Sequence, residues 1–129
     1  MEYQDLEVYQ KLLKLCLEVH EFSIMFPKFE LYELGSQVRR SSNSAPANLA
    51  EGFGNKHTKI YTESISRARG EIRETTHHLR VALLKNYIDK TKFEYFLKSY
   101  DECSRMLYGL DKSLSARALK SPITKLKTL

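Results

Sequence analysis

The sequence predicts an all-α protein, an antiparallel up-down-up-down four-helix bundle in one domain. The chain has 129 residues, enough for one hydrophobic core. Only 5 glycines and 3 prolines interrupt it, which favours long helices. Apolar residues recur at spacings of three and four in four long segments, as a buried helix face requires. The connections between these segments are short, and short connections make neighbouring helices antiparallel.

The first predicted helix covers residues 5–26. Asp5 is expected to cap it, because its carboxylate can accept a hydrogen bond from the free amides of the first turn. Pro27 is expected to end it, since the residue before a proline is pushed out of the helical region. The expected apolar face is Leu6, Tyr9, Leu13, Cys16, Val19 and Phe22.

The second predicted helix covers residues 32–53 and contains Pro46. A proline inside a helix removes one backbone hydrogen bond and crowds the preceding turn. We expect either a helix kinked near Pro46, which is the preferred interpretation, or a break with Ser44 as a new N-cap. The expected apolar face is Leu34, Val38, Ala45, Leu49 and Phe53.

The third and fourth predicted helices have the most regular periodicity. The third covers residues 58–85, and the fourth opens with a predicted capping box in which Thr91 and Glu94 satisfy each other's exposed amides. The expected buried face of the third is Tyr61, Ile65, Ala68, Ile72, Thr76, Leu79 and Leu83. That of the fourth is Phe93, Phe96, Tyr100, Cys103, Leu107, Leu110 and Leu114.

The charge is concentrated at the end of the chain. The bundle is expected to span residues 1–114, and residues 115–129 form a basic tail that is either disordered or a brief extension of the last helix. The net charge is +5, and the tail's four basic residues leave +1 on the body. Those four are Arg117, Lys120, Lys125 and Lys127.

No pattern is typical of a catalytic, metal or cofactor site. His77 and His78 are adjacent, so on a helix they point about 100° apart and cannot share a metal. Cys16 and Cys103 are expected to be buried free thiols, because each lies in an apolar helical pattern. Phosphate-loop, dinucleotide and nucleophile-elbow motifs are absent from the sequence. We therefore predict a protein that is not an enzyme and uses no cofactor.

The location is predicted from hydropathy. No apolar run approaches the roughly 20 residues that span a bilayer. The acidic, polar first five residues are unlike a secretory signal peptide. A cytoplasmic location without membrane attachment is the expectation.

Two polar stripes are candidate binding surfaces. At about 100° per residue, Arg69, Arg73 and Arg80 fall within roughly 40° of each other beside an apolar helix face. Such a row is typical of a phosphate-contacting surface, a solvated face or an intersubunit salt-bridge row. A mixed stripe on the second helix is interpreted as a hydrogen-bonded structural seam against the third helix or another subunit, with a ligand or RNA site as the alternative. Its residues are Gln37, Arg40, Ser44, Asn48 and Glu51.

Apolar residues outside the four predicted faces indicate contact with a partner. They are Tyr3, Val8, Leu12, Leu15, Phe29, Leu31, Tyr87, Ile88 and Tyr108. A four-helix monomer is not expected to face all of them inward, and exposed apolar clusters usually mark partner contacts. Homo-oligomerisation is the economical hypothesis.

Several motifs form a recognisable pattern. The longest is Ser-Ala-Pro-Ala-Asn-Leu-Ala-Glu-Gly-Phe-Gly at residues 44–54, with shorter ones at residues 5–11, 36–40 and 68–72. Over roughly residues 5–114 the chain resembles the four-helix-bundle proteins encoded in intervening sequences of bacterial 23S ribosomal RNA genes. The family usually has Ser where this chain has Glu71.

The resemblance implies a four-helix bundle, a kinked but helical second segment and a cyclic oligomer, with a pentamer as the expected form. It also implies similarity to the accessory variability determinant proteins of diversity-generating retroelements, which are basic bundles that act beside a reverse transcriptase and bind nucleic acid. It carries over no catalytic residue.

The leading functional hypothesis is a non-enzymatic oligomeric bundle associated with nucleic acid, structured RNA in particular. The alternative is a protein–protein interaction scaffold without direct nucleic-acid contact, favoured by the near-neutral body and the surplus apolar residues. A small-molecule ligand inside the bundle stays open. Phosphate contacts are expected from Arg40, Arg69, Arg73, Arg80, Arg117, Lys120, Lys125 and Lys127.

Overall fold

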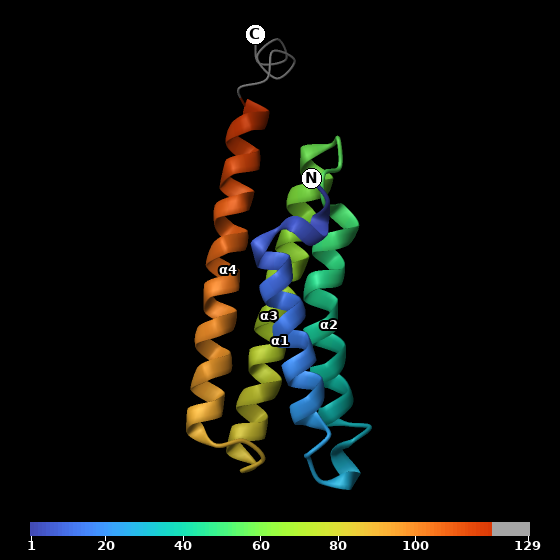
Figure 1. The fold of residues 1–129 in the computed structure, drawn as a ribbon, viewed down its shortest axis with the longest axis vertical. Coiled ribbons are helices and arrows are strands. Elements are labelled where there is room, and N and C mark those ends of the chain that lie inside the picture. Colours follow the sequence, from blue (N-terminus) through green and yellow to red (C-terminus); the bar gives the residue numbers. More distant parts are fainter. Residues whose placement is uncertain (120–129) are drawn as a thin grey trace.

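Four long helices form the protein, as seen in a computed structural model that describes residues 1–119 (Figure 1). Within these residues there is no strand. The all-α fold class and the up-down-up-down order are therefore confirmed. The helices are α1 (Glu7–Ser23), α2 (Leu34–Gly52), α3 (Thr58–Leu84) and α4 (Lys90–Leu119), and two short 3-10 helices, η1 (Tyr3–Asp5) and η2 (Lys28–Glu30), flank α1.

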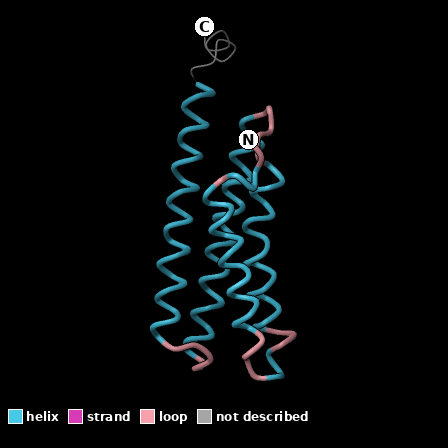
Figure 2. Tube along the Cα trace, viewed as in Figure 1, coloured by secondary structure: helices cyan, strands magenta, loops and turns pink. Residues whose placement is uncertain are grey.

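The connections alternate between the two ends of the bundle. The α1–α2 and α3–α4 connections lie at one end and the α2–α3 turn at the other (Figure 2). Each helix packs against its neighbours in sequence and α4 closes the bundle against α1, while the diagonal pairs of described helices have no Cα atoms within 8 Å of each other. The α2–α3 contact is the most extensive and the α1–α4 contact the least.

For residues 115–119 the structure shows a brief extension of the last helix, one of the two alternatives that the sequence left open. Helix α4 continues past residue 114 to Leu119 and includes Arg117. Lys120, Lys125 and Lys127 lie outside the described residues.

The predicted inner face of α1 is confirmed in part. Cys16 and Val19 are buried, and the partly buried Leu6, Tyr9 and Phe22 pack against the core. Leu13, however, is 39% exposed, and the structure buries Val8, Leu12 and Leu15, which were not predicted to face inward. Periodicity failed here because α1 has apolar residues on two faces, and only packing against the other helices selects one.

The predicted caps of α1 and α4 are wrong. Asp5 lies in η1, where its carboxylate accepts a hydrogen bond from the Glu2 amide at 2.9 Å, and no side chain caps α1. Helix α4 starts at Lys90, before Thr91. Its exposed Lys92 amide donates to the Asp89 side chain at 2.7 Å, so Asp89 caps this helix.

Helix α2 is continuous through Pro46, so a break at Ser44 is wrong. The Ser44 hydroxyl instead donates to the Arg40 carbonyl one turn back, at 2.9 Å. The Ser42 hydroxyl makes the same kind of bond to the Arg39 carbonyl at 3.0 Å. A kink at Pro46 stays a prediction.

Small residues bring α2 and α3 close together. A Cβ atom on Gly52 would overlap the side chain of Ser64. The buried Thr75 hydroxyl donates to the Ser41 hydroxyl across the contact at 2.8 Å. Thr75 and Ala82 are therefore buried where the sequence predicted Thr76 and Leu83, because the tight α2 contact draws that side of α3 inward.

The predicted face of α4 is confirmed. Its five predicted residues from Phe93 to Leu107 are buried, and Leu110 and Leu114 pack against the core.

The apolar residues outside the four predicted faces divide into two groups. Val8, Leu12, Leu15 and Ile88 belong to the core, so the prediction that such residues must face a partner is wrong for them. Tyr3, Phe29 and Tyr108 are exposed.

A buried carboxylate ties the two connections at one end of the bundle together. Glu30 in η2 is 1% exposed, and its Oε2 accepts from Lys85 Nζ at 2.7 Å and from the Tyr87 hydroxyl at 2.8 Å. These hydrogen bonds, that of Lys85 first, lower the pKa of Glu30. Sequence reasoning missed this cluster, because its members are 55 and 57 residues apart.

Candidate nucleic-acid interface

The arginine edge of α3, formed by Arg69, Arg73 and Arg80, lies beside α4. Arg69 lies over the ring of Tyr108, with 5.3 Å between its Cζ and the ring centroid, which is within the range of a cation–π contact. Arg80 lies over the ring of Phe93 in the same way, at 5.1 Å. Arg73 follows Arg69 by one helical turn, so the three guanidinium groups follow the same side of α3.

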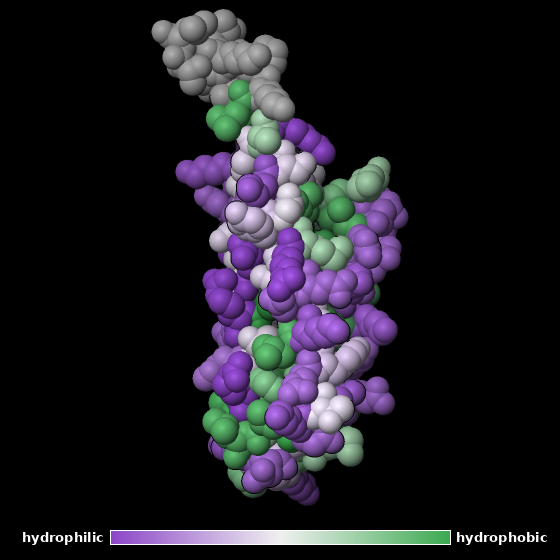
Figure 3. Space-filling model, turned by 90° about the vertical axis from the view of Figure 1, so that its left-hand side faces the viewer, coloured by the Kyte–Doolittle hydropathy of each residue, from purple (hydrophilic) through white to green (hydrophobic). Residues whose placement is uncertain are grey.

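The arginine edge has no acidic partner among residues 1–119: none of its three arginines is in an ion pair. Two acidic residues of α4 pair within their own helix, Asp101 with Arg105 at 2.9 Å and Glu94 with Lys90 at 3.9 Å. Hydrophilic residues cover most of the molecular face on the α4 side (Figure 3). Guanidinium groups that are not held in an ion pair keep their capacity for bidentate hydrogen bonds to phosphate.

Arg40 lies on the other side of α3. Its Nη2 donates to Glu74, and its Nη1 is 3.6 Å from Glu71. Those two carboxylates are roughly 140° and 200° around α3 from Arg69. The structure therefore does not bring Arg40 together with the arginine edge, and its charge is already balanced.

The predicted polar seam on α2 reaches α3 through one member. Arg40 makes the cross-helix ion pairs, whereas Ser44 bonds within its own helix. The side chains of Gln37, Asn48 and Glu51 form no hydrogen bond with any described residue. Their contact with another subunit stays a prediction.

Glu71 has a structural role where the resembling family usually has Ser. It shares Arg40 with Glu74, and His78 Nε2 lies 3.5 Å from Glu74 Oε2. Burial lowers the pKa of His78, and the charges of His77 and Arg40 lower it further. Within residues 1–119, no group of histidines, cysteines and carboxylates is arranged to hold a metal ion.

Both cysteines are buried free thiols, as predicted. Burial raises the pKa of Cys103 to about 11 and also raises the pKa of Cys16. The thiolate is the nucleophilic form, so neither thiol is activated.

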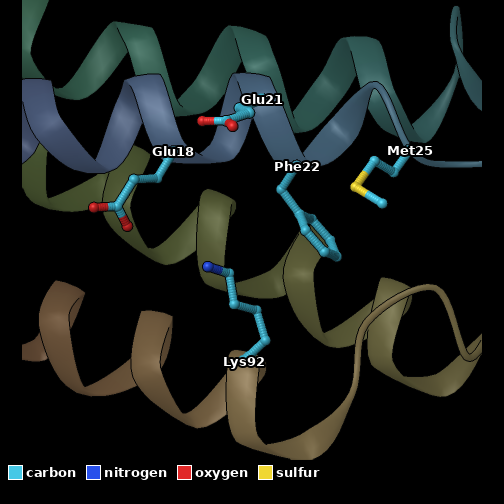
Figure 4. A pocket seen from close by; sticks show the side chains of 5 residues that line it. All are labelled: Glu18, Glu21, Phe22, Met25 and Lys92. Carbon is cyan, nitrogen blue, oxygen red and sulfur yellow. The ribbon is translucent and has the colours of Figure 1, made fainter.

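A surface pocket of about 210 Å³ lies between the end of α1 and the start of α4. Lys92 extends from α4 toward α1, and the Phe22 ring points into the space between the helices (Figure 4). The pocket brings together two carboxylates, one amine and apolar groups. Its lining residues are Glu18, Glu21, Phe22, Met25 and Lys92.

In the described part of the chain, none of the helices combines the length and the hydropathy that a bilayer span needs.

Comparison with protein families agrees with the sequence motifs, although no curated protein matches the sequence. The family model described as 23S rRNA-intervening sequence protein matches residues 4–109, most of the chain. The chain therefore belongs to the 23S rRNA-intervening sequence protein family.

Proposed function

We propose that this protein is a non-enzymatic, cytoplasmic oligomer that binds nucleic acid, structured RNA in particular, through the arginine edge. The observation that carries the proposal is the pair of guanidinium groups that lie over aromatic rings, Arg69 over Tyr108 and Arg80 over Phe93, on an edge without acidic partners among residues 1–119. Stacking on a ring restricts a guanidinium group, so less side-chain entropy is lost when it binds a phosphate.

The length of the arginine edge suits a phosphate backbone. From Arg69 to Arg80 the helix rises by about 16 Å. A nucleic-acid duplex presents several phosphates over that length. Arg40 and Arg117 lie outside the edge, and contacts from them and from the tail lysines remain predictions.

The salt dependence of binding tests this proposal. Replacing Arg69, Arg73 and Arg80 together with Gln should lower the slope of log K against log salt for a structured RNA by about 2–3, because each lost phosphate contact lowers it by roughly 0.7–0.9. A matched triple of exposed lysines, Lys14, Lys28 and Lys98, changed to Gln removes the same charge elsewhere. Equal slopes for the two triple variants, or no binding by the natural chain, would overturn the proposal.

Oligomerisation is the second part of the proposal, and the outer stripe of α1 supports it. This stripe consists of Leu13 and Leu17 of α1 and of Ile24, which directly follows the helix; they are 39%, 64% and 70% exposed. Apolar residues at such helical spacing fit another helix, and a second copy of this chain is the occupant we propose. The pentamer and the similarity to accessory variability determinant proteins rest on the family resemblance.

Light scattering tests the oligomer. The natural chain should exceed 15.1 kDa at micromolar concentration, and Leu17→Lys should lower the measured mass. Ile60→Lys is the control, because Ile60 is 43% exposed near the start of α3, at the opposite end of the bundle from Ile24. A natural chain that scatters as a monomer would remove oligomerisation from the proposal.

A protein-interaction scaffold without nucleic-acid contact is the second candidate. It is favoured by exposed apolar residues at one end of the bundle, Ile24, Met25, Phe29, Tyr32 and Leu84. Pull-down after nuclease treatment separates the two functions, because protein partners survive the treatment and RNA-bridged ones do not.

A further inference from the structure

Tyr108 is an exposed aromatic ring held among cations on the arginine edge. It is 49% exposed on α4, so about half of its surface is open to solvent. Arg69 lies 5.3 Å from the ring centroid, and Lys112 Nζ lies 5.5 Å from it. Neither cation forms an ion pair with a residue in the described part of the chain, and the Ser104 hydroxyl accepts from Arg69 Nε at 3.3 Å.

The other half-exposed tyrosine of α4 has a different environment. Tyr95 is 40% exposed and lies beneath Lys92, with 5.3 Å between Nζ and its ring centroid. Its hydroxyl, however, is bound to both carboxylate oxygens of Glu18 on α1, at 2.7 and 3.0 Å. Tyr95 is therefore explained as a contact between α1 and α4. The Tyr108 hydroxyl forms no hydrogen bond with any of residues 1–119.

The second aromatic ring on the arginine edge is not available to a ligand. Phe93 lies beneath Arg80 but is only 5% exposed, because it belongs to the core. Tyr108 is thus the one ring beneath an arginine of this edge that keeps open surface in the described structure.

A half-exposed aromatic ring beside cations that have no ion pair within residues 1–119 is an arrangement that suits an unpaired base. Unpaired bases stack on aromatic rings or on guanidinium planes, while nearby cations hold the adjoining phosphates. A base inside a duplex has both faces covered by its neighbours and cannot stack in this way. We infer that Tyr108, with Arg69 and Lys112, is the stacking position for an unpaired base in a single-stranded segment of RNA.

This inference rests on the proposed function and deepens it. The arginine edge alone would bind single strands and duplexes according to phosphate charge. The stacking position makes the same surface prefer single-stranded segments, such as loops. Loss of one stacked base weakens single-strand binding by about tenfold without changing the salt slope, since no charge is removed.

Fluorescence anisotropy with the full chain tests the inference. The probes are a labelled RNA single strand of about 12 nucleotides and an RNA duplex of the same length. Tyr108→Ala should weaken binding to the single strand by about tenfold and leave binding to the duplex unchanged. Tyr95→Ala is the matched control, since it removes a ring of similar exposure from the α1 side of the same helix.

A spectroscopic readout separates stacking from folding. A 2-aminopurine base in the single strand should lose fluorescence on binding to the natural chain, keep it with Tyr108→Ala, and lose it again with Tyr108→Phe, which restores the ring. Equal effects of Tyr108→Ala and Tyr95→Ala, or equal weakening for single strand and duplex, would overturn the stacking position. If the arginine variant still lowers the salt slope in that case, the proposed function stands and only the stacking inference fails.

Discussion

Helix α3 makes two contacts that are built in opposite ways. Toward α2 it presents small residues, a buried hydrogen bond from Thr75 to Ser41, and carboxylates that pair with Arg40. Toward α4 it meets aromatic rings, and its arginines Arg69 and Arg80 lie over them without forming an ion pair with any carboxylate of the described residues.

The difference shows why the number of arginines alone does not identify a binding surface. Arg40 reaches α3 from α2 and Arg69 is part of α3, yet the charge of Arg40 is already neutralised by two carboxylates, so binding a phosphate there would require breaking those ion pairs. A phosphate at Arg69 meets no such competing carboxylate among residues 1–119. The α4 side is therefore available to an anionic partner, and the α2 side stabilises the bundle.

The largest expected effect on stability comes from a substitution that disrupts the close α2–α3 contact. Gly52→Ala should reduce the free energy of unfolding by about 2 kcal/mol, because the new methyl group overlaps the buried Ser64 side chain. Urea unfolding at fixed protein concentration measures it. Gly109→Ala is the control, since this glycine of α4 has open space around it. The alanine should raise the free energy of unfolding by about 0.5–1 kcal/mol, because it makes the unfolded chain less flexible. A neutral Gly52→Ala would contradict the close packing.

A smaller effect separates the paired arginine from an unpaired one. Arg40→Gln should cost about 0.5 kcal/mol in the same unfolding measurement, because it removes partly exposed ion pairs with Glu71 and Glu74. Arg73→Gln should leave the free energy of unfolding unchanged, because Arg73 has no ion pair with any residue up to position 119. Equal losses of unfolding free energy for the two variants would show that the ion pairs on the α2 side of α3 do not stabilise the bundle more than the unpaired arginine on the α4 side.

The smallest effect concerns pH and His78 on the α2 side. The pKa of His78 is lowered from 6.5, so as the pH falls below that value the unfolded chain binds a proton that the folded chain does not. This contribution to stability is present above pH 6.5 and lost on acidification. His78→Gln should reduce the loss of unfolding free energy between pH 7.5 and pH 5.5. His57→Gln, a substitution at an exposed histidine, should leave that loss unchanged. Identical pH profiles for the natural chain and His78→Gln would exclude this histidine.

Local sequence determined the parts of the fold in which one face of a helix is clearly apolar. The buried side of α4 was predictable because its residues from Phe93 to Leu107 have no competing apolar face. The common direction of Arg69, Arg73 and Arg80 was predictable for a similar reason, since residues separated by four and seven positions share one side of any helix.

Only the tertiary structure decided what those faces contact. Helix α1 has apolar residues on two faces, and packing against α2 and α4 selected Leu12 and Leu15 over Leu13 and Leu17. The ion pair of Arg40 with Glu74 and the stacking of Arg69 on Tyr108 join residues that lie more than 30 positions apart. Periodicity reports the direction in which a side chain leaves its own helix, whereas its partner depends on which helix lies there and at what height.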